Sequence, residues 1–116
     1  MTNKDDLVYL KHIADAILKI DEYTDKVDSL MFFKNTLIQD GVIRQIEIIG
    51  EATKNLSAPL RDKYPQVPWQ DIAGMRDKLI HGYFGVDIDT VWNTIKKDIP
   101  DLKEKIATII AKINDA

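Results

Sequence analysis

The stretch IDTVWNTIKKDIPDLKEKIATIIAKI, residues 88–113, decides the fold. Its apolar residues recur mostly at steps of three and four, the spacing of one face of an α-helix. These residues are Ile88, Val91, Trp92, Ile95, Ile99, Leu102, Ile106, Ile109 and Ile113. Pro100 lies inside the pattern, but the apolar phase is the same on both sides. The stretch therefore predicts one helix with a kink at Pro100, capped at its start by Asp87.

Two further helical patterns precede this stretch. The first spans residues 7–20, and a polar turn is expected over residues 21–29. The second begins near Leu30 and continues to Thr53. Gly41 interrupts it at a cost of ~1 kcal/mol, but the apolar phase holds across the glycine. We therefore expect one long helix from Leu30 to Thr53.

Proline marks the main loop of the chain. Three prolines fall within residues 58–68, and Pro68 suits the first position of a third helix over about residues 69–80. Gly82 and Gly85 follow at the exit of that helix. Four amphipathic helices with short links predict an all-α, antiparallel, up-down bundle of four to five helices. We expect it to form a single domain over residues 1–116.

Composition excludes several classes of protein. The chain has 116 residues, no cysteine and a net charge of −3, which excludes disulfides, thiolate metal sites and a surface coated in positive charge for DNA. No apolar run approaches the ~20 residues of a membrane span. The N-terminus is polar and acidic rather than a signal peptide, so we expect a cytoplasmic protein without a membrane partner.

Metal and cofactor motifs are absent from the sequence. The two histidines, His12 and His81, lie 69 positions apart without a paired metal ligand at helical spacing. The sequence also lacks a glycine-rich phosphate loop. We expect neither a metal nor a cofactor, and we interpret His12 as a surface or rim residue.

The segment MRDKLIHGYF, residues 75–84, departs from this structural pattern. It places Arg76, His81 and Tyr83 within eight residues at the end of a helix. An arginine can hold a phosphate with two donors, and a histidine can exchange a proton near neutral pH. These two groups suffice to cleave RNA without a metal. The base deprotonates a ribose 2′-OH, and the cation stabilises the negative charge that builds on the phosphoryl oxygens. A structural helix cap is the alternative interpretation.

Helix geometry limits how these side chains converge. In an ideal helix Arg76 and His81 lie ~7.5 Å apart along the axis and ~140° apart around it. The three groups can therefore meet only if the helix ends or distorts near Gly82, or if a symmetric dimer brings a second copy of each into one cleft.

The pattern Arg76-Asp77-x-x-x-His81-x-Tyr83 resembles the Arg-x4-His-x-Tyr motif of the HepT-like branch of HEPN-domain ribonuclease toxins. Three surrounding features resemble the same family over essentially the whole chain. They are Ile49-Gly50-Glu51-Ala52, Pro68-Trp69 before Met75, and Tyr83-Phe84-Gly85-Val86-Asp87 followed by Val91-Trp92. The resemblance implies a HEPN-like helical bundle that works as a homodimer.

The resemblance also implies roles for individual residues. Arg76 would bind and stabilise the scissile phosphate, and His81 would be the general acid/base. Asp77 would orient the histidine or shape the cleft. Glu51 is a candidate charge partner of Arg76, with a capping or surface carboxylate as the alternative.

Tyr83 carries a separate implication. In this family a minimal nucleotidyltransferase antitoxin transfers AMP from ATP to the motif tyrosine, which would fill the RNA cleft with negative charge. A tyrosine beside a glycine at a helix end can be exposed for such modification, although Tyr83 can also pack with Phe84.

Two classes of function stay open. The first is a metal-independent endoribonuclease toxin that is inhibited by a nucleotidyltransferase partner. It would cleave RNA rather than DNA because its nucleophile is the 2′-OH, and single-stranded or splayed RNA is favoured over a duplex. The second is a non-catalytic HEPN module that binds a nucleotide or its partner. The intact Arg76, His81 and Tyr83 favour the first.

Overall fold

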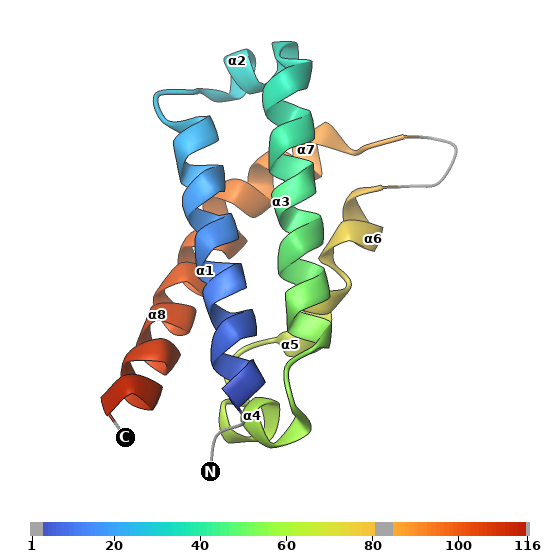
Figure 1. Ribbon diagram of the computed structural model, residues 1–116. Coiled ribbons are helices and arrows are strands. Elements are labelled where there is room, and N and C mark those ends of the chain that lie inside the picture. The colour runs from blue at the N-terminus through green and yellow to red at the C-terminus, as the bar shows by residue number, and fades with distance from the viewer. Residues whose placement is uncertain (1–3, 81–84, 116) are drawn as a thin grey trace.

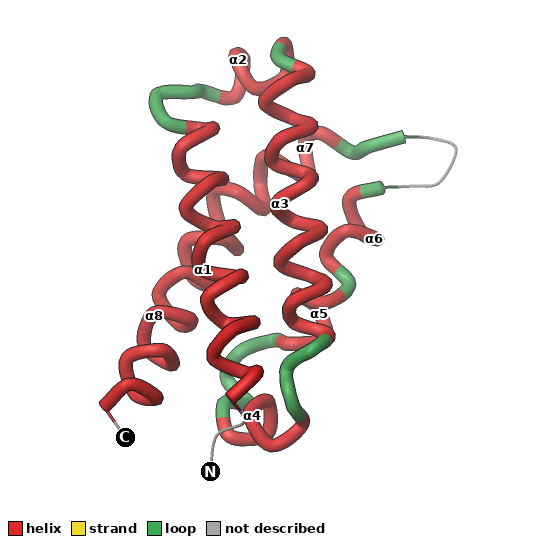
Figure 2. Tube along the Cα trace, in the orientation of Figure 1, coloured by secondary structure: helices red, strands yellow, loops and turns green. Residues whose placement is uncertain are grey.

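The computed structural model describes residues 4–80 and 85–115, and the regular elements within these ranges are all helical (Figures 1 and 2). In chain order they are α1 (Lys4–Thr24), α2 (Ser29–Lys34), α3 (Thr36–Lys54), α4 (Ala58–Lys63), α5 (Trp69–Ala73), α6 (Met75–Leu79), α7 (Ile88–Asn93), the π-helical turn η2 (Thr94–Asp98) and α8 (Ile99–Asp115). The prediction of an all-α bundle is confirmed.

The core of the bundle forms around α1, which packs against both α3 and α8. In Figure 1 both neighbours run antiparallel to α1. The three helices bury one apolar stripe each, and every side chain of these stripes is at most 1% exposed. The stripes consist of Leu10, Ile13, Ile17 and Ile20, of Val42, Ile46 and Ile49, and of Ile99, Ile106 and Ile109. Burying such a side chain contributes ~1.5–3 kcal/mol, so these contacts dominate the stability of the fold.

The second long helix begins later than predicted. α2 ends at Lys34, and Asn35 is extended, with φ −114° and ψ 94°. Its side chain accepts a hydrogen bond from the Ile38 N–H at 3.0 Å. The prediction of a continuous helix from Leu30 is wrong, because Asn35 acts as an N-cap and starts a new helix. Continuity across Gly41 is confirmed, since this glycine lies within α3.

Part of the predicted loop is helical. The Ser57 hydroxyl caps α4 by accepting from the Leu60 N–H at 3.3 Å. Asp6 of α1, which is 2% exposed, accepts from the Ser57 N–H at 2.8 Å and from its hydroxyl at 2.6 Å. The prediction of a loop is therefore wrong for residues 58–63, where a serine cap and Pro59 in the first turn begin a helix.

The predicted third helix is divided in two. α5 ends at Ala73 and α6 begins at Met75, with Gly74 between them at φ −94° and ψ 6°. The prediction of one helix over residues 69–80 is wrong, because glycine favours helix poorly and here turns the chain. α6 ends at Leu79, and Ile80 is already extended.

The C-terminal stretch remains helical throughout, as predicted. Asp87 caps α7 by accepting from the Thr90 N–H at 3.1 Å. The wider π-helical turn η2 directly precedes α8, whose second residue is Pro100. Proline has no N–H to donate to the preceding turn, so a local change of helix type accommodates it without ending the helix.

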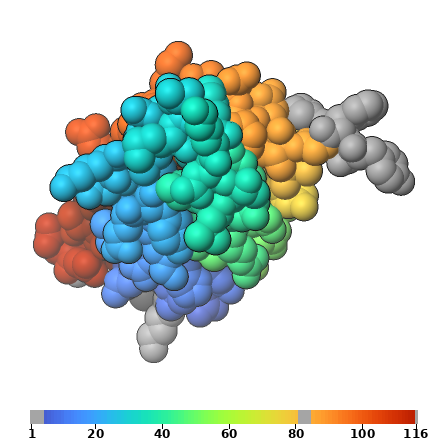
Figure 3. Space-filling view, turned by 90° about the horizontal axis from the view of Figure 1, so that it is seen from above, coloured from blue at the N-terminus to red at the C-terminus, as the bar shows by residue number. Residues whose placement is uncertain are grey.

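One end of the molecule exposes large apolar side chains. They lie where α2 and α3 begin, at the end on which Figure 3 looks down, and they are Leu30, Met31, Phe33 and Leu37. Apolar surface of this kind is typical of interaction sites. In the described part of the chain, no helix combines the length and the apolar character that a bilayer span needs.

Candidate functional site

Arg76 is presented by the short helix α6. Met75 and Leu79, one turn apart, are both buried and fix this helix to the core. Arg76 therefore points away from the core, and its side chain is 49% exposed. A half-exposed arginine on a helix held by two apolar residues can bind a ligand without disturbing the core.

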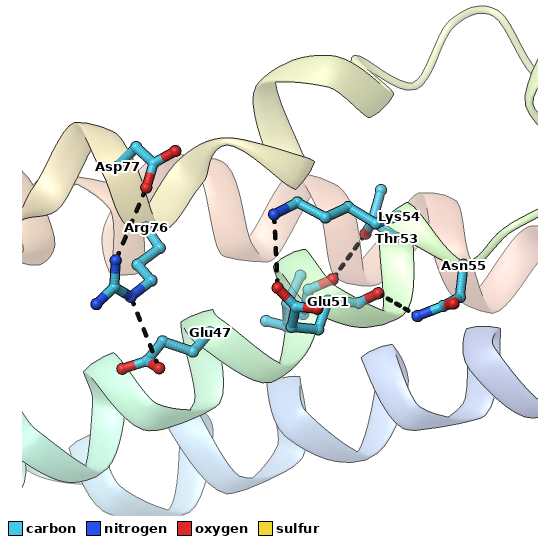
Figure 4. A network of polar contacts seen from close by, with 8 residues as sticks. Glu47, Glu51, Thr53, Lys54, Asn55, Arg76 and Asp77 are labelled. Atoms are coloured by element: carbon cyan, nitrogen blue, oxygen red, sulfur yellow. Dashed lines mark hydrogen bonds and ion pairs between the residues drawn. The ribbon is translucent and has the colours of Figure 1, made fainter.

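Two carboxylates hold the guanidinium of Arg76 (Figure 4). Its Nε lies 3.7 Å from an Oε2 of Glu47 on α3, and its Nη1 lies 3.8 Å from an Oδ1 of Asp77. Glu47 is 32% exposed in its side chain, whereas Asp77 is 81% exposed. Exposed pairs of this kind add little stability. Their effect is to orient the guanidinium between α6 and α3.

Gly50 sets the distance between α3 and the α5–α6 segment. A Cβ built on Gly50 would lie 3.2 Å from the backbone oxygen of Ala73. A larger residue would push Ala73, and the following helix with Arg76, away from α3. The glycine of the Ile49-Gly50-Glu51-Ala52 motif thus has a packing role next to the site.

Glu51 lies one turn after Glu47 on α3. Its carboxylate pairs with Lys54 at 3.5 Å, while the ion pair from α3 to Arg76 is made by Glu47 (Figure 4). Sequence reasoning missed Glu47. The sequence did contain an indication of its place. Residues four positions apart share a helix face, and Glu47 precedes the motif residue Glu51 by four positions. A catalytic contribution of Glu51 stays a prediction.

His81 and Tyr83 lie outside the described residues. The described chain on either side of them is paired: Ile80 and Val86 form an antiparallel bridge, and the Asp87 N–H donates to the Leu79 carbonyl at 2.9 Å. α6 has ended before this point, so the ideal-helix separation of Arg76 and His81 does not apply. The expectation that the helix ends close to the motif histidine agrees with this backbone.

A pocket of about 500 Å³ opens beside Arg76. Its walls come from α1, α3 and the α5–α6 segment, and its polar and aromatic lining consists of Tyr9, His12, Arg44, Glu47, Glu51, Lys54, Asn55, Arg76 and Asp77. Arg76, Asp77 and Glu51, three of the predicted site residues, are therefore brought together in one pocket. His12 is exposed, as predicted, and lies on its wall. Within the described ranges, no group of three His, Asp or Glu side chains is arranged to hold a metal ion.

Comparison with known proteins gives a consistent result. The family model described as "Ribonuclease HepT-like" matches residues 13–109. A protein of Methanocaldococcus jannaschii named "Gamma-glutamylcyclotransferase and putative RNase" is 50% identical over 96% of this chain, which spans 50% of that relative's length. A "Probable ribonuclease HepT" of Thermococcus cleftensis is 48% identical over 84% of this chain and 88% of its own. A second protein of Methanocaldococcus jannaschii, named "Putative RNase", is 42% identical over 99% of both chains. No solved structure matches this chain significantly.

Proposed function

Because the chain belongs to the HepT-like ribonuclease family, we propose that it is a metal-independent endoribonuclease with Arg76 and His81 as its catalytic residues. The observation that carries the proposal is the half-exposed guanidinium of Arg76, oriented by Glu47 and Asp77 on the wall of an open pocket. Arginine binds phosphate with two parallel hydrogen bonds and stays charged at every physiological pH.

The proposed reaction is a transesterification within the RNA. His81 takes the proton of a ribose 2′-OH, and the 2′ oxygen attacks the adjacent phosphorus. The bond from phosphorus to the 5′ oxygen breaks, and that oxygen leaves with a proton from solvent. The products end in a 2′,3′-cyclic phosphate and a 5′-OH. Arg76 stabilises the additional negative charge on the phosphoryl oxygens in the transition state.

Cleavage of total cellular RNA tests this proposal. Wild-type protein is compared with His81→Ala, and intact mass shows that neither preparation carries an adduct. We expect discrete fragments with 2′,3′-cyclic phosphate ends from the wild type, none from the variant, and undiminished cleavage in excess EDTA. Fragments with other ends, loss of activity in EDTA, or equal activity of the variant would each contradict the mechanism. An inactive, unmodified wild type would favour a non-catalytic binding module.

The proposal extends to the control of this activity. A minimal nucleotidyltransferase antitoxin transfers AMP to Tyr83: the phenol oxygen attacks the α-phosphate of ATP, and pyrophosphate leaves. The negative charge of the attached nucleotide then competes with RNA for Arg76. Support comes from the Arg-x4-His-x-Tyr spacing of the sequence. In addition, α6 ends at Leu79, four positions before Tyr83 in the chain.

Intact mass measures this modification directly. After incubation with the antitoxin and ATP, wild-type protein is expected to gain one or more AMP units, and Tyr83→Phe is expected to gain none. Tyr64→Phe is the matched control, because Tyr64 is buried in the core. An adduct on Tyr83→Phe would show that another residue is the acceptor.

The same proposal makes the chain a toxin that acts as a homodimer. The exposed side chains of Leu30, Met31, Phe33 and Leu37 are available for contact with a partner chain. Light scattering is expected to give twice the chain mass of 13.3 kDa. Expression without the antitoxin is expected to stop growth for the wild type and not for His81→Ala. A monomer, or growth arrest by both proteins, would contradict this part of the proposal.

A further inference from the structure

We propose that the pocket between α1, α3 and α6 is a nucleotide subsite, in which one unpaired base of an RNA strand stacks on His12 and a neighbouring phosphate binds Arg44. The inference rests on the proposed ribonuclease function, because the pocket is continuous with Arg76. It gives a role to the histidine outside the Arg-x4-His-x-Tyr motif and to an arginine that sequence analysis did not single out.

The aromatic wall of the pocket comes from α1. Tyr9 and His12 lie three residues apart on one face of this helix, with ring centroids 6.0 Å apart and ring planes at 85°. Tyr9 is half-buried and packs against the core, so it holds a fixed position. His12 is exposed, and its ring is nearly perpendicular to that of Tyr9, so the two rings do not stack face to face on one another. Splayed bases of single-stranded RNA stack on aromatic rings of this kind.

Three cationic side chains line the pocket, and one of them, Lys54, is paired with Glu51. Arg44 precedes Glu47 by three residues on α3, so it lies about one helical turn from the carboxylate that holds Arg76. Arg44 is exposed, and among the described side chains it takes part in no ion pair. Arg76, in contrast, is held by Glu47 and Asp77. The free guanidinium of Arg44 is thus available for a second phosphate beside the one assigned to Arg76.

The shape and composition of the pocket fit one nucleotide. Its volume of about 500 Å³ lies within the range of ~300–1,000 Å³ typical of small-molecule sites. A free phosphate would use the arginines alone and leave the Tyr9–His12 pair unexplained. A duplex keeps its bases stacked on one another and cannot offer a base to His12. The set of side chains therefore favours an unpaired nucleotide of a single strand.

Fluorescence anisotropy with a single-stranded 2′-O-methyl RNA of mixed sequence tests the subsite, since this probe binds without a nucleophilic 2′-OH. The variants are His12→Ala, His12→Phe and Arg44→Ala in the full chain, with Lys11→Ala as the matched control. Lys11 is the exposed neighbour of His12 and is not part of the pocket lining. Thermal unfolding verifies that each variant is folded.

We expect His12→Ala to raise Kd about tenfold, since loss of one stacked base has an effect of this order. We expect His12→Phe to bind within about threefold of the wild type, because phenylalanine retains a ring for stacking. Arg44→Ala is expected to raise Kd and to reduce the slope of log Kd against log salt by about one phosphate contact. Lys11→Ala is expected to leave both quantities near their wild-type values.

The outcomes separate the subsite from the ribonuclease function. If the wild type cleaves total RNA and His12→Ala binds the probe as tightly as the wild type, the subsite is refuted and the function stands. If His12→Phe binds as weakly as His12→Ala, base stacking is refuted. If the wild type neither binds the probe nor cleaves RNA, the function fails and the subsite fails with it.

Discussion

The interior between α1, α3 and α8 and the surface formed by α5 and α6 differ in how they use their residues. The three long helices bury continuous apolar stripes, with Ile46 of α3 at 0% exposure. α5 and α6 have five residues each; α6 buries Met75 and Leu79 and leaves Arg76, Asp77 and Lys78 exposed. The difference indicates that the residues that stabilise the fold and the residues proposed for catalysis lie in separate parts of this small molecule. Substitutions are therefore expected to affect one without the other.

The largest effect on stability is expected in the interior. Ile46→Ala removes a completely buried side chain, and the cavity it leaves lowers the free energy of unfolding by about 2–5 kcal/mol. The matched control is Leu18→Ala, because Leu18 is an apolar residue of the long helix α1, is 51% exposed and lies outside the proposed dimer contact. Its effect is expected to stay within about 0.5 kcal/mol. Equal losses in urea denaturation would contradict the distinction between interior and surface.

A smaller effect is expected where the two regions meet. Gly50→Ala places a Cβ 3.2 Å from the backbone oxygen of Ala73, and relief of this contact is expected to cost about 1–3 kcal/mol. It also shifts the segment that carries Arg76, so RNA cleavage is expected to fall as well.

Gly41→Ala is the comparison variant for this prediction. Its Cβ would also have a neighbour at 3.2 Å, but that neighbour is the ring of Tyr23, an exposed and movable side chain. Because alanine favours helix by ~1 kcal/mol over glycine, we expect Gly41→Ala to leave stability unchanged or raised. Thermal unfolding measures the midpoints of both variants. A higher midpoint for Gly50→Ala than for Gly41→Ala would show that the contact with Ala73 does not set the position of α5 and α6.

The smallest effect is expected at the surface pair of Arg76. Glu47→Gln removes the charge that orients this guanidinium. Because the pair is partly exposed and weak, its loss is expected to lower the rate of RNA cleavage by about two- to fivefold. Glu51→Gln is the control, since Glu51 pairs with Lys54 instead. Initial rates of RNA cleavage measure both variants. A larger loss for Glu51→Gln would assign the supporting role to Glu51, as the sequence first indicated.

Sequence periodicity predicted the interior better than the surface. The apolar steps of α1, α3 and α8 follow from burial of one helix face, so the long helices could be located, including continuity across Gly41 and past Pro100. The breaks at Asn35 and Gly74 could not be located in this way. At each position the sequence is compatible both with the end of one helix and with a continuous helix. Asn35 is compatible with both, and only the structure shows that its side chain accepts a hydrogen bond from the Ile38 N–H and so starts a new helix.

The candidate site shows the same division. Arg76 and Asp77 are neighbours in the sequence, so their motif was readable before the fold was known. Glu47 and His12 reach the same pocket from α3 and α1, and only the packing of these helices brings them there. The sequence therefore located the motif but not the residues of α1 and α3 that line the same pocket.

The most direct test of the account is the rate of RNA cleavage by Arg76→Ala, measured with the thermal unfolding midpoint of the same preparation. Loss of a group that stabilises transition-state charge typically lowers the rate by ~10²–10³. Because Arg76 is half exposed and its pairs are weak, the unfolding midpoint is expected to stay within a few degrees of the wild type. A folded Arg76→Ala protein that cleaves RNA at the wild-type rate would contradict the assignment of the active site to this surface.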